Sequence, residues 1–326
     1  MSEISDHGIS RRQLITGAGV LALGALTGCG GRDSAPVLAR SDTVRRAEER
    51  RRRAGARVQA VELTAGVTAV DLGGPVVQTW AYDEAVPGRE LRITAGDVLR
   101  ARVRNALPAE TSVHWHGVAL RNDMDGVPGI TQSPIGPGGE EFTYEFTAPD
   151  PGTYFFHPHV GVQTDHGLYA PLIVDDPDEP GSYDVEQVVV LDDWTDGVGE
   201  DPDVILHQLL RNGHWMGDMP GMGMGGPPGM QGASQLLPLG PDTGDVHYPL
   251  YLANGRVPTA PHAIRARPGQ RLRLRLVNAG SDTAFRVGIG GHRMTVTHSD
   301  GFPVRPVEVD ALLVAMGERY DVIVTL

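Results

Sequence analysis

A short pattern that recurs 173 residues along the chain most constrains what this sequence can fold into. Residues 91–105 and residues 264–278 align without a gap. Both copies alternate apolar and polar side chains, as half-buried β-strands do. A repeat one domain long implies two copies of one domain rather than a solenoid. The matched positions include Gly96 with Gly269 and Asn105 with Asn278.

The same period-two alternation begins at Val58, and turns rich in Gly and Pro separate the short apolar runs. No long helical period occurs before about residue 200. These features predict an all-β chain of two tandem β-sandwiches. We place the first domain at residues 60–178 and the second at 184–326, because Asp, Pro and Gly cluster between them.

The composition excludes several classes of function. Acidic residues number 41 against 28 basic ones, all of them Arg, so the formal charge is −13 and nucleic-acid binding is not the main task. Hydrophobic residues make up 40% of the chain, which is enough for real cores. The single cysteine, Cys29, excludes an intramolecular disulfide, a cysteine-rich zinc site and an iron–sulfur cluster.

The first 28 residues are typical of an export signal. Arg11 and Arg12 precede an apolar stretch over residues 14–26, which is shorter than the roughly 20 residues that a membrane span needs. The paired arginines indicate twin-arginine export. The stretch ends in Leu-Thr-Gly-Cys29, which resembles a bacterial lipobox. We expect residues 1–28 to be cleaved and Cys29 to carry lipid, which anchors an extracytoplasmic protein to the cell membrane. The alternative is a buried N-terminal helix with an incidental cysteine.

Residues 29–59 are predicted to form an Arg-rich linker. Eight arginines lie between Arg40 and Arg57, without an apolar period. A solvated, transiently helical linker is the favoured interpretation, and a basic segment that meets anionic lipid is the alternative.

A Met- and Gly-rich loop is predicted at residues 216–232 of the second domain. Five methionines occur among Gly and Pro between Met216 and Met230. Thioether sulfur is a soft ligand that suits Cu(I), whereas the competing interpretation is a loop with incidental methionines.

Two His-x-His pairs are candidate metal ligands. His114 and His116 form the first pair, and His157 and His159 form the second. Residues i and i+2 of a strand point to the same face, so each pair presents two imidazoles side by side. Neutral imidazole suits copper, zinc and iron. Two such pairs, each at the end of a predicted strand, favour a metal site over incidental core or surface histidines.

The repeat gives an internal comparison for these histidines. The offset of 173 residues places Val287 and Ile289 at the positions of His114 and His116. We expect the second copy to keep the strand with aliphatic side chains, so function explains the histidines better than the fold does. His166, near the second pair, is expected to lie beside the ligands without binding metal, or to face solvent.

Several motifs together resemble those of the multicopper oxidases. The resemblance covers residues 60–326, with residues 247–326 similar to the second domain of that family. It is closest to actinobacterial copper-resistance oxidases of laccase type. The motifs similar to the first domain are His-Trp-His-Gly at 114–117, Met-Asp-Gly-Val-Pro at 124–128, Thr-Gln-Ser-Pro-Ile at 131–135, Gly-Thr-Tyr-Phe-Phe-His-Pro-His at 152–159 and Gly-Leu-Tyr-Ala-Pro-Leu-Ile-Val at 167–174.

This resemblance implies cupredoxin-like Greek-key sandwiches and a copper cofactor. It implies one-electron oxidation of phenols or metal ions, coupled to the reduction of O2 to water at a trinuclear copper cluster. His114 resembles the type 2 copper ligand, and the other three histidines resemble ligands of the type 3 pair. Asp125 matches an acidic residue that assists proton delivery, although a turn-forming role in Asp125-Gly126 is an equal alternative.

The sequence departs from the family pattern in its missing ligands. The family's His-Pro-x-His-x-His and His-Cys-His runs, which lie in a third domain, do not occur here, and Cys29 is already assigned to lipid. We therefore expect half of the trinuclear ligands, no type 1 copper and no turnover by this chain alone. Either a partner chain supplies the third domain, with O2 and a small reductant or Cu(I) as substrates, or the chain is a copper-sequestering lipoprotein without turnover or an inactive gene fragment.

Overall fold

The structure is a computed structural model that describes residues 38–212, 244 and 246–326. The predicted signal, Cys29 and the methionines of the predicted loop lie outside these residues. Within the described ranges, no helix is both long and apolar enough to cross a membrane.

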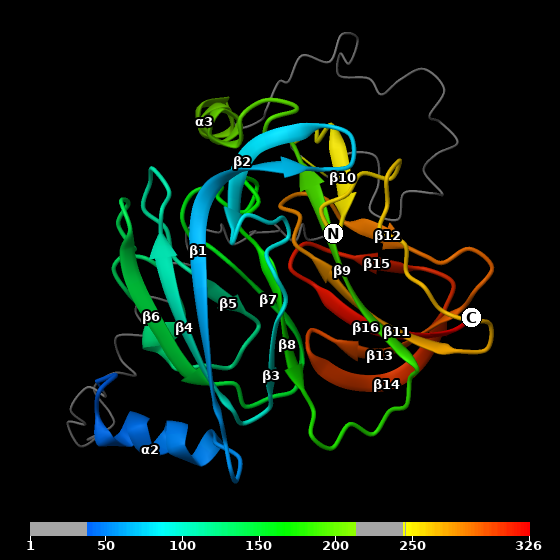
Figure 1. Ribbon diagram of the computed structural model, residues 1–326, viewed down its shortest axis with the longest axis horizontal. Coiled ribbons are helices and arrows are strands. Elements are labelled where there is room, and N and C mark those ends of the chain that lie inside the picture. The colour runs from blue at the N-terminus through cyan, green and yellow to red at the C-terminus, as the bar shows by residue number, and fades with distance from the viewer. Residues whose placement is uncertain (1–37, 213–243, 245) are drawn as a thin grey trace, which may run out of the picture.

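The first half of the chain forms two four-stranded sheets that face each other (Figure 1). In one sheet the order is β2-β1-β4-β6, with β1 parallel to β4. In the other sheet the order is β3-β8-β7-β5. The strands are β1 (Val58–Asp71), β2 (Val76–Tyr82), β3 (Leu91–Thr94), β4 (Val98–Asn105), β5 (His114–His116), β6 (Glu140–Thr147), β7 (Gly152–His157) and β8 (Ala170–Asp175).

The second half forms a six-stranded sheet of order β10-β9-β11-β16-β13-β14 and a separate pair, β12 with β15. The prediction of an all-β chain is therefore confirmed. The strands are β9 (Val185–Trp194), β10 (Leu250–Ala253), β11 (Arg271–Asn278), β12 (Phe285–Val287), β13 (Met294–Ser299), β14 (Phe302–Val309), β15 (Leu312–Val314) and β16 (Arg319–Thr325).

The repeat has a structural counterpart in β4 and β11, which are 173 residues apart at both ends. Asn105 and Asn278 end these strands and are fully buried. Each uses its amide to close the following loop. Asn105 Nδ2 donates to the carbonyl of Ile135, and Asn278 Nδ2 donates to that of Val314. The same side chain therefore closes the equivalent loop in both halves.

The prediction of a strand that includes both Val287 and Ile289 is wrong. The structure has β12 at Phe285–Val287, paired with β15, and Ile289 lies outside any strand. The pair Phe285–Val314 lies within one residue of the position that the bridge between Thr111 and Ile135 takes in the first half, just before His114. The second copy thus keeps the segment that leads to β5. The described residues there do not continue into a counterpart of β5.

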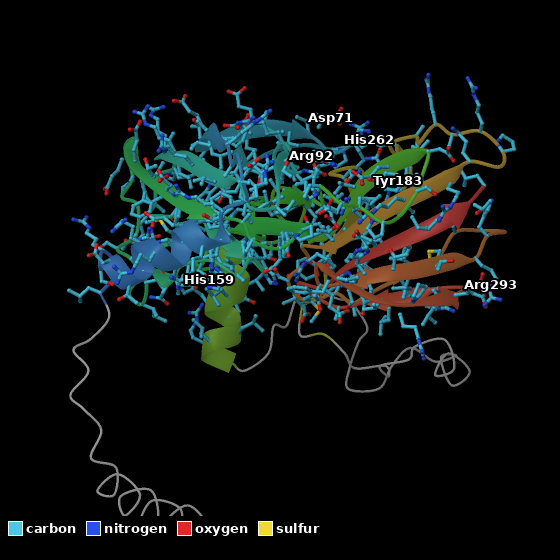
Figure 2. All side chains as sticks on the ribbon, turned by 90° about the horizontal axis from the view of Figure 1, so that it is seen from below. Asp71, Arg92, His159, Tyr183, His262 and Arg293 are labelled. Atoms are coloured by element: carbon cyan, nitrogen blue, oxygen red, sulfur yellow. The ribbon has the colours of Figure 1, made fainter. Side chains whose placement is uncertain are left out.

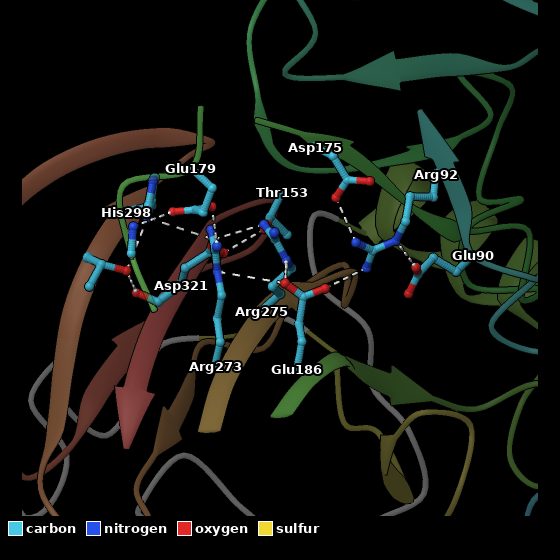
Figure 3. Close-up of polar contacts among 12 residues, drawn as sticks. Glu90, Arg92, Thr153, Asp175, Glu179, Glu186, Arg273, Arg275, His298 and Asp321 are labelled. Carbon is cyan, nitrogen blue, oxygen red and sulfur yellow. Dashed lines mark hydrogen bonds and ion pairs between the residues drawn. The ribbon is translucent and has the colours of Figure 1, made fainter. Parts of the chain in front are cut away.

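The two halves share an apolar core and a polar network. One buried cluster joins Phe155 and Ile173 of the first half to Val190 and Val277 of the second. Beside it, Arg273 and Arg275 meet Asp321, and Thr153 Oγ1 on β7 donates to the Asp321 carboxylate at 2.5 Å (Figure 3). Since buried charges need such partners, the network fixes how the halves meet.

The structure differs from the expected linker at residues 42–51, which form helix α2 (Asp42–Arg51). Ser41 caps its first turn, and Figure 1 shows the helix beside the first sandwich. Glu48 is buried there, and its carboxylate accepts a hydrogen bond from the backbone N–H of Thr147 on β6. A tertiary contact therefore holds a segment that has no apolar period.

Candidate metal centre

Strands β5 and β7 lie side by side and carry three of the four predicted ligands. In their antiparallel register, His114 lies opposite His157 and His116 lies opposite Phe155. Trp115, between the two histidines of β5, points into the core and is fully buried. Strand alternation therefore sends the tryptophan inward and both imidazoles to the other face.

The structure brings His114, His116 and His157 together. One ring nitrogen from each lies within 4.8 Å of the others. The nearest pair is His116 Nδ1 and His157 Nε2, 3.1 Å apart. Nitrogens on one metal ion with bonds of about 2 Å lie roughly 3.3 Å apart in tetrahedral geometry, so this spacing fits two ligands of one ion.

His159 lies beside this group, just outside β7. Its ring centroid is 4.4 Å from that of His114, and its ring stacks on His157 at 5.2 Å. Its backbone N–H donates to Ser112 Oγ, which fixes the turn after the strand. Figure 2 shows His159 at the rim of the first sandwich, where its side chain is exposed to solvent.

Hydrogen bonds fix the tautomers of two imidazoles. His114 Nδ1 lies 2.7 Å from the carbonyl oxygen of Asp125, and His157 Nδ1 lies 2.9 Å from that of Pro158. A carbonyl oxygen only accepts, so both Nδ1 atoms carry the proton. Each ring then has its lone pair on Nε2, which is how histidines that bind metals are usually held. The Nε2 atom of His157 faces His116 Nδ1.

Burial and neighbouring groups keep three of the four imidazoles, those of His116, His157 and His159, neutral. Burial, followed by the neighbouring His157, lowers the pKa of His116 to about 3. Burial, followed by His114, lowers the pKa of His157 to about 4. The pKa of His159 is lowered as well, chiefly by burial. At neutral pH these side chains are therefore unprotonated and able to bind a metal ion.

Asp125 lies against the first ligand pair. Its carboxylate oxygen is 3.4 Å from His114 Nδ1. Gly126 makes this approach possible: its φ is +77°, and a Cβ there would lie 1.8 Å from the carbonyl oxygen of Val113. The loop can therefore reach His114 only with glycine at this position.

Two residues of the second half, which the sequence reasoning missed, also reach the site. Gly317 lies so close to His116 that a Cβ on it would be 2.9 Å from the ring. Arg319 is buried, and it donates to the carbonyls of Thr153 and Gly317. The only signal in the sequence is a glycine before an Arg-Tyr-Asp strand start, and this signal does not reveal a contact across domains.

His166 does not face solvent, so that alternative is wrong. It is 5% exposed and stacks on Trp80 with 4.6 Å between ring centroids. Its Nδ1 lies 3.0 Å from the Asp196 carboxylate. The side chains beside it that could bind a metal ion with it are Asp201 and Asp203, not the four histidines.

Comparison with known proteins agrees with this arrangement. Family models described as multicopper oxidase match residues 64–179 and 186–326. The chain is 50% identical over 317 residues to the multicopper oxidase MmcO of Mycobacterium tuberculosis, with 97% of this chain and 61% of that protein covered. It is 38% identical over 278 residues to copper resistance protein A of Pseudomonas syringae pv. tomato, with 81% and 45% covered.

Solved structures share the fold. A multicopper oxidase from Pseudomonas thermotolerans matches with a TM-score of 0.67 and 28% identity, over 83% of this chain and 59% of that one. A blue copper oxidase from Nitrosomonas europaea matches with a TM-score of 0.64 and 29% identity, over 82% and 76%. The predicted cupredoxin-like sandwich fold is therefore confirmed.

The chain spans about three-fifths or less of the length of these curated relatives. Both halves nevertheless match models of one family, and the converging imidazoles suit the copper that this family binds. The chain belongs to the multicopper oxidase family.

Proposed function

We propose that this chain takes part in a copper-dependent oxidase and supplies four imidazoles to its copper cluster. The observation that carries the proposal is the convergence of histidines from β5 and β7, with ring nitrogens within 4.8 Å of one another. His114 is assigned to a type 2 copper. The type 3 pair is assigned to His116, His157 and His159.

When bound, copper supplies the one-electron chemistry that couples oxidation of a small reductant to reduction of O2 to water. The side chains of this chain hold the ligand imidazoles in place and position a proton. His114 and His157 are oriented by the carbonyls that accept their Nδ1 protons. Asp125, 3.4 Å from His114, is placed to hold a proton for the reduction of O2, which consumes protons as well as electrons.

The remaining parts of the oxidase are assigned to a third cupredoxin domain. That domain would supply the other cluster ligands and the thiolate of a type 1 copper, either in a longer chain or in a partner chain. Phenols, metal ions and Cu(I) are the proposed reductants. The proposed location is extracytoplasmic, after twin-arginine export, with Cys29 as the lipid anchor and the Met-rich loop 216–232 as a Cu(I) ligand segment.

A second candidate function is copper sequestration without turnover, or the chain is an inactive fragment. Sequestration is favoured by the cluster itself, because its imidazoles need no further domain to be neutral and close together.

The test measures copper and oxidation in the full chain. We expect bound copper but neither phenol nor Cu(I) oxidation by this chain alone, and oxidation once a third domain is supplied. Replacement of all four histidines by alanine is expected to remove the copper of the cluster and to abolish the restored oxidation. His292→Ala, in a turn of the second half, is the control and should change neither. Unchanged copper in the fourfold variant would contradict the site, and copper binding that never yields oxidation would favour sequestration.

A further inference from the structure

A second group of metal-competent side chains lies at the start of helix α3 (Pro202–Asn212). It consists of His166, Asp201 and Asp203, whose ligand atoms all lie within 4.8 Å of one another. His166 belongs to the loop between β7 and β8, whereas the two aspartates begin the helix. Figure 1 shows α3 beside β2 and away from β5.

His166 is held in one orientation by contacts from β2 and from the end of β9. Its ring stacks on Trp80, and its Nδ1 lies 3.0 Å from Asp196 Oδ2. Thr79 Oγ1 lies 2.7 Å from that same oxygen and 2.5 Å from the backbone carbonyl oxygen of His166, so it contacts both residues. A carboxylate accepts, so Nδ1 carries the proton and Nε2 points away from Asp196.

The Nε2 atom is the unusual feature. It is buried without a hydrogen-bond partner, in a side chain that is 6% exposed. Buried polar atoms without a partner are rare and call for an explanation. The nearest carboxylate oxygen, Oδ2 of Asp203, is 3.6 Å away, which is too far for a hydrogen bond but close enough for a shared ion.

The two aspartates leave room for such an ion. Asp201 Oδ1 accepts from the backbone N–H of Asp203 at 2.9 Å, which caps the helix and leaves the second oxygen of Asp201 available. Asp203 is 56% exposed, so water can complete a coordination shell from outside. The result is one imidazole nitrogen and two carboxylates around one point.

A protonated His166 between Asp196 and Asp203 is the competing explanation. Burial opposes the charge, but Asp196 outweighs it and raises the pKa of His166. The 3.6 Å gap argues against this state, because an imidazolium Nε2–H facing a carboxylate forms a hydrogen bond of about 2.8 Å.

We propose that His166, Asp201 and Asp203 bind a divalent cation of borderline character, of the kind represented by Zn²⁺ and Co²⁺. The carboxylate of Asp196, which accepts the Nδ1 proton of His166, orients the imidazole as carboxylates commonly do behind metal-bound histidines. The mixed nitrogen and oxygen donor set suits such ions and not Cu(I). This site shares no residue with the four histidines of β5 and β7, so its test is independent of the test of the proposed function.

The test counts Co²⁺ and Zn²⁺ bound by the full chain in equilibrium dialysis. The double variant Asp201→Asn/Asp203→Asn should bind one ion fewer than the unaltered chain and should lose the rise in unfolding temperature that Zn²⁺ causes through this site. The variant without the four histidines should keep that ion. Asp176→Asn/Asp178→Asn is the matched control. Asp176 accepts from the backbone N–H of Asp178 at 2.8 Å in the same way, but among the described residues no histidine completes a group of ligands there.

Equal ion counts in the Asp201→Asn/Asp203→Asn variant and the unaltered chain would overturn the proposal, as would an equal loss in the control. His166→Gln adds a second test, because it keeps a buried polar side chain but removes the imidazole. Retention of the ion in that variant would also overturn the site.

Discussion

The segments around residues 111–117 and 285–290 start alike and end differently. Each follows a buried asparagine that closes a loop, and each begins with an antiparallel pairing, Thr111 with Ile135 and Phe285 with Val314. The first segment continues into β5, which pairs with β7. The second segment leaves its strand after Val287. The two histidines of the first segment therefore share one strand, whereas the matching positions of the second segment do not.

The two segments also differ in what they face. Val287 and Ile289 pack against the apolar core of the second half. His114 and His116 are partly exposed and lie beside other imidazoles and Gly317 of the other half. All four side chains are partly exposed, so the two copies differ in their neighbours, which are an apolar core in one and other imidazoles in the other.

The largest expected effect comes from the glycine that lets Asp125 reach β5. Gly126→Ala should lower the free energy of unfolding by on the order of 4 kcal/mol, because its Cβ would meet the Val113 carbonyl and the loop would have to move. Copper affinity should fall with it, because His114 loses the carbonyl that orients it.

Gly129→Ala is the matched control for that substitution. Gly129 has the same φ of +77°, but nothing lies within 4 Å of its Cβ position. Only the cost of a left-handed conformation remains, about 1–2 kcal/mol, and copper binding should be unchanged. Urea unfolding and copper titration measure both effects, and equal losses in the two variants would contradict the close approach.

The next effect is on the free energy of unfolding of the metal-free chain, which should depend on pH. Because the pKa values of His116 and His157 are lowered to about 3 and about 4, the folded state does not take up the protons that the unfolded chain binds below about pH 6.5. The stabilisation is complete above that pH and is lost as the pH falls toward these values. Between about pH 7 and about pH 4.5 we expect a loss on the order of 2 kcal/mol from each of these imidazoles.

The variant without the four histidines provides the comparison for that experiment. Its urea midpoint should fall less over the same pH range than that of the unaltered chain, because no imidazole of the cluster remains to be protonated. An equal fall in both proteins would show that the cluster is not the source. Other titrating groups are common to both and cancel in the difference.

The smallest expected effect is in the second copy. Val287→His/Ile289→His restores the His-x-His spacing there, yet it should leave the copper content unchanged, because Ile289 lies outside any described strand and both side chains pack against the apolar core. A loss of about 1 kcal/mol in stability is expected from polar groups against the apolar core. Additional copper in this variant would show that spacing alone makes a site.

The sequence predicted the features that follow from local pattern. Alternation located strands such as β4 and β11, and the repeat matched Asn105 with Asn278, whose roles agree in the structure. The prediction of a strand at 287–289 failed at Ile289, because a segment is a strand only where another strand pairs with it, and such pairing is not a property of one segment. The features that the local pattern did not predict depend on contacts with residues distant in the sequence.

Helix α2 and His166 illustrate this second class. The Arg-rich segment has no apolar period, and its docking depends on a contact from Glu48 to a backbone N–H 99 residues away. The burial of His166 depends on Trp80 and Asp196, which come from β2 and from the loop after β9. The contact of Gly317 with His116 likewise appears only when the two halves are in place.

Because of that last contact, one side of the histidine site forms only when the two sandwiches are packed together. Strands β5 and β7 belong to the first half, but His116 rests against Gly317, and Arg319 reaches the backbone of β7 from the second. A chain in which only the first half has folded would hold the imidazoles without this support. Tight metal capture would then report that the two halves have come together, and it would separate correctly assembled molecules from half-folded ones.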